Sequence, residues 1–307
     1  MIWSRQVALC AVVLAGIAGV MTAQQVADTS FRPPIRKPAY AEGQGPVVGV
    51  DEGHYNFHTT GGRYQPFAEL LRRDGYVVRP LTSKFTPKLL AGVRILVISN
   101  ALHERNQKDW SLPNPSAFSG DEIAAVRDWV KGRGSLLLIA DHQPFAGAAA
   151  DLAAAFGLRW QNGYVVDGSQ RGPLKFRIED GSLSRHPITE GRTLEERVSQ
   201  VATFTGSAFR ADQKVEGLLI LSPTAVSRTP TAPKQKWEEW AVTPVGGSFQ
   251  GAVTRFGRGR LAAFGEAAMF SAQVAGAEKS PMGMNHPDAR DNAQFLLNLM
   301  HWLTGLL

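Results

Sequence analysis

The sequence predicts an α/β fold, a mostly parallel β-sheet with helices on both faces. Two observations predict it. Between Val47 and Phe156, short apolar runs alternate with segments of helical periodicity, the order expected of parallel strands joined through helices. The runs are also apolar throughout, with no polar alternation, which is typical of strands buried on both faces.

The first predicted strand is Val47–Asp51. Gly61–Asp74 is expected to be a helix because its apolar side chains recur at spacings that share one face. Gly75 ends that helix, and strands are predicted at Tyr76–Leu81 and Ile95–Ile98. These elements form the first strand–helix–strand unit of the sheet.

Ser119 and Glu122 have the spacing of a capping box and predict the start of a helix that ends at Gly132. Leu136–Ala140 is a fully apolar strand, and Ala146–Phe156 is a small-residue helix. The second half is less regular, with a proline-containing loop over residues 223–236 and a turn at Gly257–Arg260. We predict strands there at Leu174–Ile178, Val198–Phe204, Gly217–Ser222, Phe249–Arg255 and Leu261–Phe264. A helix at Asp288–Leu303 is predicted to close the chain.

The N-terminal residues differ from the rest in composition. A continuous apolar or small-residue run, Val7–Met21, contains no charge and is shorter than the roughly 20 residues of a membrane span. We interpret residues 1–23 as a signal peptide, residues 24–46 as a flexible proline-rich leader and residues 47–307 as a single domain. The protein is therefore expected to be exported, periplasmic or extracellular; the alternative is an uncleaved N-terminal membrane anchor.

Composition limits the classes of function. Charged residues make up 20% of the 307 positions and the net charge is +6, with basic and acidic residues interspersed. No basic stripe with interleaved aromatics occurs, so nucleic acid is not an expected partner. The single cysteine, Cys10, lies in the predicted signal peptide, which leaves the mature chain without a thiol nucleophile or a thiolate metal site. The oligomeric state stays open.

Four apolar runs end in ionisable or amide residues, and these define the candidate site. The carboxyl ends of parallel strands share one edge of a sheet, where ligands bind in open α/β folds. We therefore expect the side chains after these runs to meet in one place. The candidate ligand-binding residues are Asp51, Glu52, His54, Asn100, Asp141, His142 and Glu266, together with Asn285 before the closing helix.

Several candidates have a second, purely structural interpretation. Asp51 either binds a ligand or caps the following turn, and a lone buried carboxylate is costly in either case. Asp141 and His142 either form a base–orienter pair, or His142 only stabilises its own loop. Glu266 can instead be stabilised by the dipole of a following helix. The region of Asn285 can instead form the N-terminal cap of the last helix.

Searches for metal and cofactor motifs are negative. His54, His58, His103, Asp141, His142 and Glu266 have suitable ligand chemistry, but no His-x-x-x-His or His-Glu-x-x-His spacing occurs. Phosphate and dinucleotide loops are absent, and Ser248 misses the nucleophile-elbow spacing by one residue. We expect no metal and no cofactor.

Several segments together resemble a known superfamily. Val48–His54, Ile139–Phe145, Gly265–Phe270 and Asp291–Phe295, with His186–Thr189, resemble uncharacterised bacterial domain-of-unknown-function proteins of the class I glutamine amidotransferase-like superfamily, related to the trehalose-utilisation type. The resemblance spans roughly residues 47–302 and implies a flavodoxin-like sheet. Active members carry a cysteine on a sharp turn that corresponds to Ser99–Ala101, where this chain has none. Cysteine-dependent glutaminase activity is therefore excluded.

Three functional hypotheses are compatible with these residues. The first is a protein that binds a small polar ligand, such as a carbohydrate, with Trp110 and Phe145 as a stacking face. The second is a hydrolase with a carboxylate as general base and His54 or His142 as acid or orienter. The third is a structural domain of an envelope assembly.

Overall fold

The structure is a computed structural model, and it describes residues 25–307. The predicted signal peptide and Cys10 lie outside the described residues.

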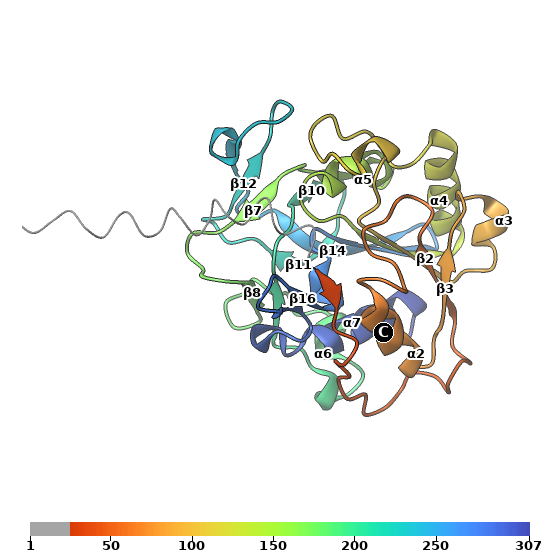
Figure 1. Cartoon of the computed structure of the whole chain (residues 1–307). Coiled ribbons are helices and arrows are strands. Elements are labelled where there is room, and N and C mark those ends of the chain that lie inside the picture. Colours follow the sequence, from red (N-terminus) through yellow and green to blue (C-terminus); the bar gives the residue numbers. More distant parts are fainter. Residues whose placement is uncertain (1–24) are drawn as a thin grey trace, which may run out of the picture.

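The centre of the molecule is a nine-stranded sheet (Figure 1). Along one path the strands are β3 (Val77–Leu81), β2 (Val47–Asp51), β4 (Ile95–Ser99), β5 (Ser135–Ile139), β15 (Gly259–Phe264), β14 (Phe249–Phe256), β10 (Phe209–Ala211) and β6 (Leu158–Trp160), and β11 (Glu216–Ile220) also pairs with β14.

Strands β3, β2, β4, β5 and β15 are parallel to one another, and antiparallel pairing begins at β14. The predicted α/β class with a large, mostly parallel sheet is thus confirmed. The β14–β15 hairpin turns at Gly257, whose φ of +59° favours glycine, as the sequence indicated.

Helices cover both faces of the sheet (Figure 1). On one face, α2 (Gln65–Arg73) and α7 (Asn292–Thr304) pack against one set of strand side chains, which includes Val97. On the other face, α3 (Pro87–Leu90), α4 (Gly120–Gly132) and α5 (Phe145–Ala154) cover the alternate set, which includes Leu96. Successive side chains of each buried strand point to opposite faces of the sheet, so every strand contributes to the hydrophobic core on each face.

The first residues of two helices can be compared with the sequence predictions. Ser119 and Glu122 form the predicted capping box at the start of α4. The closing helix begins later than predicted, at Asn292 instead of Asp288. The first four predicted positions do not continue it, because the Nδ1 atom of His286 accepts a hydrogen bond from the Asp288 amide and closes a separate 3₁₀ turn, Pro287–Ala289.

Three small sheets lie outside the central one. They are β13 (Ala241–Pro244), β12 (Val226–Thr229) and β7 (Tyr164–Val166); β8 (Leu174–Arg177) and β9 (Gln200–Thr203); and β1 (Val26–Ala27), β16 (Ala272–Ala275) and β17 (Ser280–Gly283). The β12–β13 hairpin extends away from the main sheet (Figure 1).

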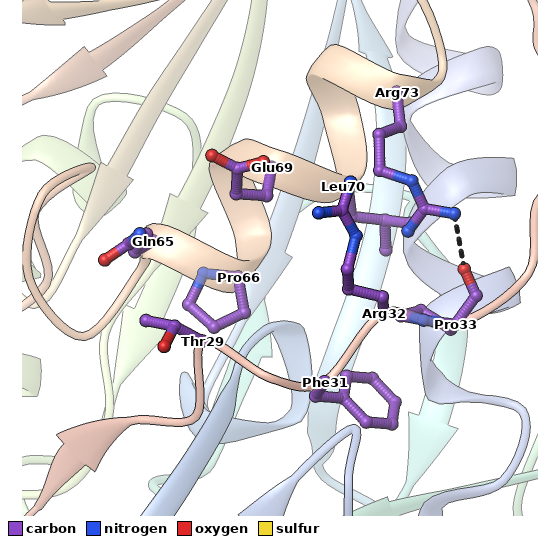
Figure 2. Close-up of a pocket in the computed structure, with 9 residues that line it drawn as sticks. All are labelled: Thr29, Phe31, Arg32, Pro33, Gln65, Pro66, Glu69, Leu70 and Arg73. Carbon is purple, nitrogen blue, oxygen red and sulfur yellow. Dashed lines mark hydrogen bonds between the residues drawn. The ribbon is translucent and has the colours of Figure 1, made fainter.

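We expected residues 24–46 to be a flexible proline-rich leader, but its described part, residues 25–46, packs on the domain. Val26 and Ala27 pair with β16, and the side chains of Phe31, Ile35 and Tyr40 pack against the core. In Figure 2 the Arg73 guanidinium of α2 donates to the Pro33 carbonyl at 2.8 Å, beside a pocket of about 170 Å³. Contacts with α2 and β16, which the local sequence does not reveal, hold the segment in place.

No helix within residues 25–307 is both long enough and apolar enough to cross a membrane.

Candidate functional site

Four predicted residues follow neighbouring parallel strands at one edge of the sheet. Asp51 ends β2, Asn100 follows β4, Asp141 lies two residues after β5, and Glu266 lies two residues after β15. These strands are adjacent in the order β2-β4-β5-β15. The Asn100 Oδ1 atom accepts a hydrogen bond from the Asp141 amide at 2.9 Å, so the ends of β4 and β5 are joined directly.

Asn100 occupies a sharp turn. Its φ is +49°, a left-handed conformation that asparagine tolerates better than most residues. Its carbonyl accepts a hydrogen bond from the Phe57 amide, and the His54 carbonyl accepts one from Leu102. The loop after β2 and the turn after β4 therefore hold each other in position.

His54 lies between two carboxylates. Its Nδ1–H donates to Oδ1 of Asp51 at 2.8 Å, and its Nε2–H donates to Oε1 of Glu122 at 2.9 Å. Burial alone would lower the pKa of His54, but the hydrogen bonds and charges of Asp51 and Glu122 outweigh it and raise that pKa. Both ring nitrogens are used within the fold, so His54 acts as a structural tie between β2 and α4.

Two predicted candidates do not join the cluster. Oε1 of Glu52 accepts hydrogen bonds from the amide and the hydroxyl of Thr60, each at 2.7 Å. Asn285 donates to Asp28 and to the Gln273 carbonyl, which anchors it to the β1–β16–β17 sheet. Their hydrogen bonds arrange loops and link no other candidate residue.

Asp141 and Glu266 form the acidic centre of the edge. Glu266 is fully buried, and its carboxyl group accepts hydrogen bonds from the amides of Ala268 at 2.9 Å and Met269 at 2.7 Å. Burial, reinforced by the charge of Asp141, raises the pKa of Glu266 well above its usual value. Asp141 is the more accessible of the two; its Oδ1 accepts hydrogen bonds from the His142 amide and from the hydroxyl of Thr205.

His142 presents an unused ring nitrogen. Its Nδ1–H donates to the Gln143 carbonyl at 2.7 Å, and within residues 25–307 Nε2 makes no hydrogen bond; in the neutral ring with this tautomer Nε2 is an acceptor. The imidazole lies flat on Tyr164 of β7, with ring centroids 3.9 Å apart and an interplanar angle of 11°. The ring is half-buried, so one polar atom remains for an incoming group.

Half-buried aromatic rings continue from His142 in two directions. The Trp110 centroid lies 6.1 Å from that of His142, and Trp240 and Trp237 lie 5.7 and 5.4 Å from Tyr164. We call Trp110, His142, Tyr164, Trp237 and Trp240 the aromatic rim. The prediction that Phe145 joins a stacking face is wrong: Phe145 is 1% exposed because it packs into the core at the first turn of α5.

Sequence reasoning missed three residues of this edge as site residues. His58 is buried against Ser99 and Tyr64, and burial, with the charges of Arg63 and His142, lowers its pKa to about 3. Tyr64 donates to the Ala267 carbonyl and Thr205 to Asp141. His58 and Tyr64 follow no predicted strand, and Thr205 follows the predicted strand Val198–Phe204, whose run is not apolar throughout.

The strand-edge cluster is neither a metal-ligand group nor part of the pockets described below. Within residues 25–307, no three His, Cys, Asp or Glu side chains are grouped so that they could hold a metal ion. Pockets of about 170, 690 and 460 Å³ are lined by residues other than the strand-edge cluster. The cluster is therefore a polar network joined to the aromatic rim through His142, whose amide donates to Asp141.

Comparison with known proteins gives a fold relationship. No protein-family model matches the chain, and no curated protein matches its sequence. The N-terminal domain of mmIFT52 superposes with a TM-score of 0.57 at 14% identity, covering 84% of this chain and 97% of that domain. A cytoplasmic protein from Salmonella typhimurium LT2 gives a TM-score of 0.51 at 15% identity, covering 84% of this chain and 98% of that one.

ThuA-like proteins, of the trehalose-utilisation type, are also among the structural neighbours. One from Bacteroides uniformis ATCC 8492 gives a TM-score of 0.44 at 12% identity, covering 89% of this chain and 94% of that one. At such identities the comparisons concern the fold alone.

Proposed function

We propose that this protein binds a small hydroxyl-rich ligand, of the sugar class, at the aromatic rim beside Asp141. The observation that carries the proposal is the arrangement of His142: an imidazole stacked on Tyr164, with Nε2 free to accept a hydrogen bond. A hydroxyl group is both donor and acceptor, which suits this atom and the neighbouring carboxylate.

Asp141 supplies a second acceptor. Its Oδ1 is engaged by the His142 amide at 2.8 Å, whereas its Oδ2 has only a long contact of 3.3 Å with the Thr205 hydroxyl. Two adjacent residues therefore each offer an acceptor to a hydroxyl-rich ligand. The indole and phenol rings of the rim offer flat apolar faces of the kind that aromatic side chains use in binding pockets.

The order of the sheet supports the finer fold assignment, which is part of the proposal. Numbered along the chain, the five parallel strands β2, β3, β4, β5 and β15 lie in the order 2-1-3-4-5. This is the flavodoxin-like order, in which ligands bind where the strand order reverses, between the first and third strands. Asp51 ends the first of these strands, and Asn100 directly follows the third. We also propose that the protein belongs to the amidotransferase-like superfamily and is exported.

Hydrolysis is a second candidate, favoured by the contrast between Asp141 and Glu266. Two carboxyl groups whose environments differ are a common acid–base arrangement. However, Glu266 has no exposed surface, and both of its oxygens accept backbone amides. A proton donor must reach the substrate, so binding is the better supported function.

Isothermal titration calorimetry of the purified chain against a panel of mono- and disaccharides tests the proposal. We expect saturable binding of at least one sugar, weakened about tenfold or more, roughly 1.4 kcal/mol, by His142→Ala and by Trp240→Ala. Leu194→Ala is a matched control, because Leu194 is an apolar side chain that is 68% exposed outside the rim.

Two outcomes contradict the proposal. No heat with any sugar would favour a structural domain, and binding unaffected by both rim variants would place the ligand elsewhere. Release of a reducing sugar from a disaccharide, abolished by Asp141→Asn, would favour the hydrolase.

A further inference from the structure

A separate pocket of about 690 Å³ lies between β8, the loop after β7 and the end of β11. Its volume is in the range of small-molecule sites, roughly 300–1,000 Å³. Figure 1 shows β8 and β11 on the side of the molecule opposite α3 and α4. None of the strand-edge candidates or rim residues lines it, so a ligand of this pocket would be independent of the proposed function.

The two carboxylates of this pocket are already used by the fold. Asp167 accepts hydrogen bonds from the hydroxyls of Ser169, Ser222 and Thr224 at 2.7, 2.5 and 2.8 Å. Burial alone would raise the pKa of Asp167, but these hydrogen bonds outweigh it and lower the pKa to about 2. Asp180 accepts hydrogen bonds from the amide and the hydroxyl of Ser182. Asp167 is therefore occupied by donors of the fold, and Asp180 keeps only its Oδ2 atom, 3.8 Å from the Arg177 guanidinium.

The three cationic side chains of the pocket retain free donors. Arg171 is exposed and makes no ion pair or hydrogen bond within residues 25–307. Lys175 approaches Asp288 only to 3.6 Å, beyond good hydrogen-bond length. The Arg177 Nε–H donates to Gln200 at 2.9 Å, while its contacts with Glu179 and Asp180 are 3.7 and 3.8 Å. Among the charged side chains of the pocket, free hydrogen-bond donors therefore outnumber free acceptors.

Part of the remaining wall is apolar, beside the polar side chains of Ser169, Gln170, Ser182 and Ser222. The apolar lining consists of Leu174 and Phe176 of β8 together with Ile220, Leu221 and Pro223. Phe176 is buried, and Leu174 packs against the core, so this wall is part of the rigid fold. We propose that this pocket binds a small organic anion with an apolar body, its charge held by Arg171, Lys175 and Arg177.

Fluorescence titration of the full chain with 8-anilinonaphthalene-1-sulfonate, an anion with an aromatic body, tests this site. We expect saturable binding that weakens about tenfold or more in Arg171→Glu and in Lys175→Glu. Lys84→Glu is the control, because Lys84 is an exposed lysine outside the pocket. N-phenyl-1-naphthylamine, which has the same aromatic rings without the sulfonate, should bind much more weakly.

Equal affinity for the charged and the neutral dye would overturn the proposal, since the pocket would then be only an apolar surface. Equal affinity of Arg171→Glu, Lys175→Glu and Lys84→Glu for the anion would overturn it as well. Circular dichroism melting checks that each variant is folded; if Lys175→Glu is not, Lys175→Gln replaces it with the same expected direction.

Discussion

The Nε2 atom of His54 lies 2.9 Å from Oε1 of Glu122, and this contact joins the end of β2 to the first turn of α4. The same Glu122 oxygen accepts the Phe85 amide at 3.0 Å, and the other oxygen closes the capping box with Ser119. One carboxylate therefore fixes a helix start, a loop and a histidine.

Glu122→Ala is expected to destabilise the protein by about 3 kcal/mol, because it leaves His54 buried with one of its two partners and removes the cap of α4. Urea denaturation measures the change. Asp121→Ala is the matched control: Asp121 is an exposed acid in the same helical turn, and its loss should cost less than about 1 kcal/mol. Similar losses in both variants would mean that the contact with His54 contributes little.

His54 also makes stability depend on pH. Its pKa is raised in the folded state, so its stabilising contribution is fully present below the unfolded pKa of about 6.5 and is lost as pH rises through the folded value. The stability difference between wild type and His54→Gln should therefore shrink between pH 6 and pH 9, measured by urea denaturation at fixed ionic strength. A difference that stays constant would contradict a charged His54 in the folded protein.

Glu266 is also expected to lower the stability of the protein as pH rises, and its effect should begin at a lower pH than that of His54. Burial, reinforced by Asp141, raises its folded-state pKa, so folding favours the protonated form and stability falls as pH rises above about 4.5. Glu266→Gln abolishes this share of the pH dependence, although it costs about 1–2 kcal/mol at low pH by placing an amide donor against the Ala268 or Met269 amide. An unchanged pH slope from pH 4.5 to pH 7 would show that Glu266 is ionised when folded.

The sequence predicted the part of the site that depends on uninterrupted apolar strands. Val47–Asp51, Ile95–Ser99 and Ser135–Ile139 are buried on both faces, so their runs are unambiguous, and parallel topology then brings Asp51, Asn100 and Asp141 to one edge. Only the order of the strands is needed to predict that these three residues lie at the same edge.

The remainder depends on contacts between distant segments. Strands β7, β12 and β13 are short and partly exposed, and their mixed composition gives no period; only pairing with one another defines them. The stacking of His142 on Tyr164 results from that pairing, so it could not be inferred. The N-terminal segment was misread for the same reason, because proline-rich sequence shows no periodicity even where tertiary contacts order it.

Asn100 allows a backbone effect to be separated from a side-chain effect. Both Asn100→Gly and Asn100→Ala lose the hydrogen bond from the Asp141 amide, but only alanine also incurs the steric penalty of a φ of +49°. We expect Asn100→Ala to be about 1 kcal/mol less stable than Asn100→Gly in urea denaturation. Equal stabilities would show that the turn relaxes to a negative φ when the asparagine is removed.

Asp74 and His301 should hold the N-terminal segment on the domain. Both side chains are fully buried; Oδ2 of Asp74 accepts a hydrogen bond from His301 Nε2 at 2.7 Å, and its Oδ1 accepts one from the Ala39 amide at 2.7 Å. Asp74→Ala leaves the histidine and the amide without their buried acceptor, which is expected to cost about 3 kcal/mol. Because the amide belongs to the N-terminal segment, trypsin should then cleave the Arg36–Lys37 bond faster than in wild type, as followed by mass spectrometry. Glu69→Ala, an exposed substitution on the same helix, should leave the cleavage rate unchanged. If Asp74→Ala lowers stability but leaves the Arg36–Lys37 bond as protected as in wild type, the buried pair joins α2 to α7 without fastening the segment.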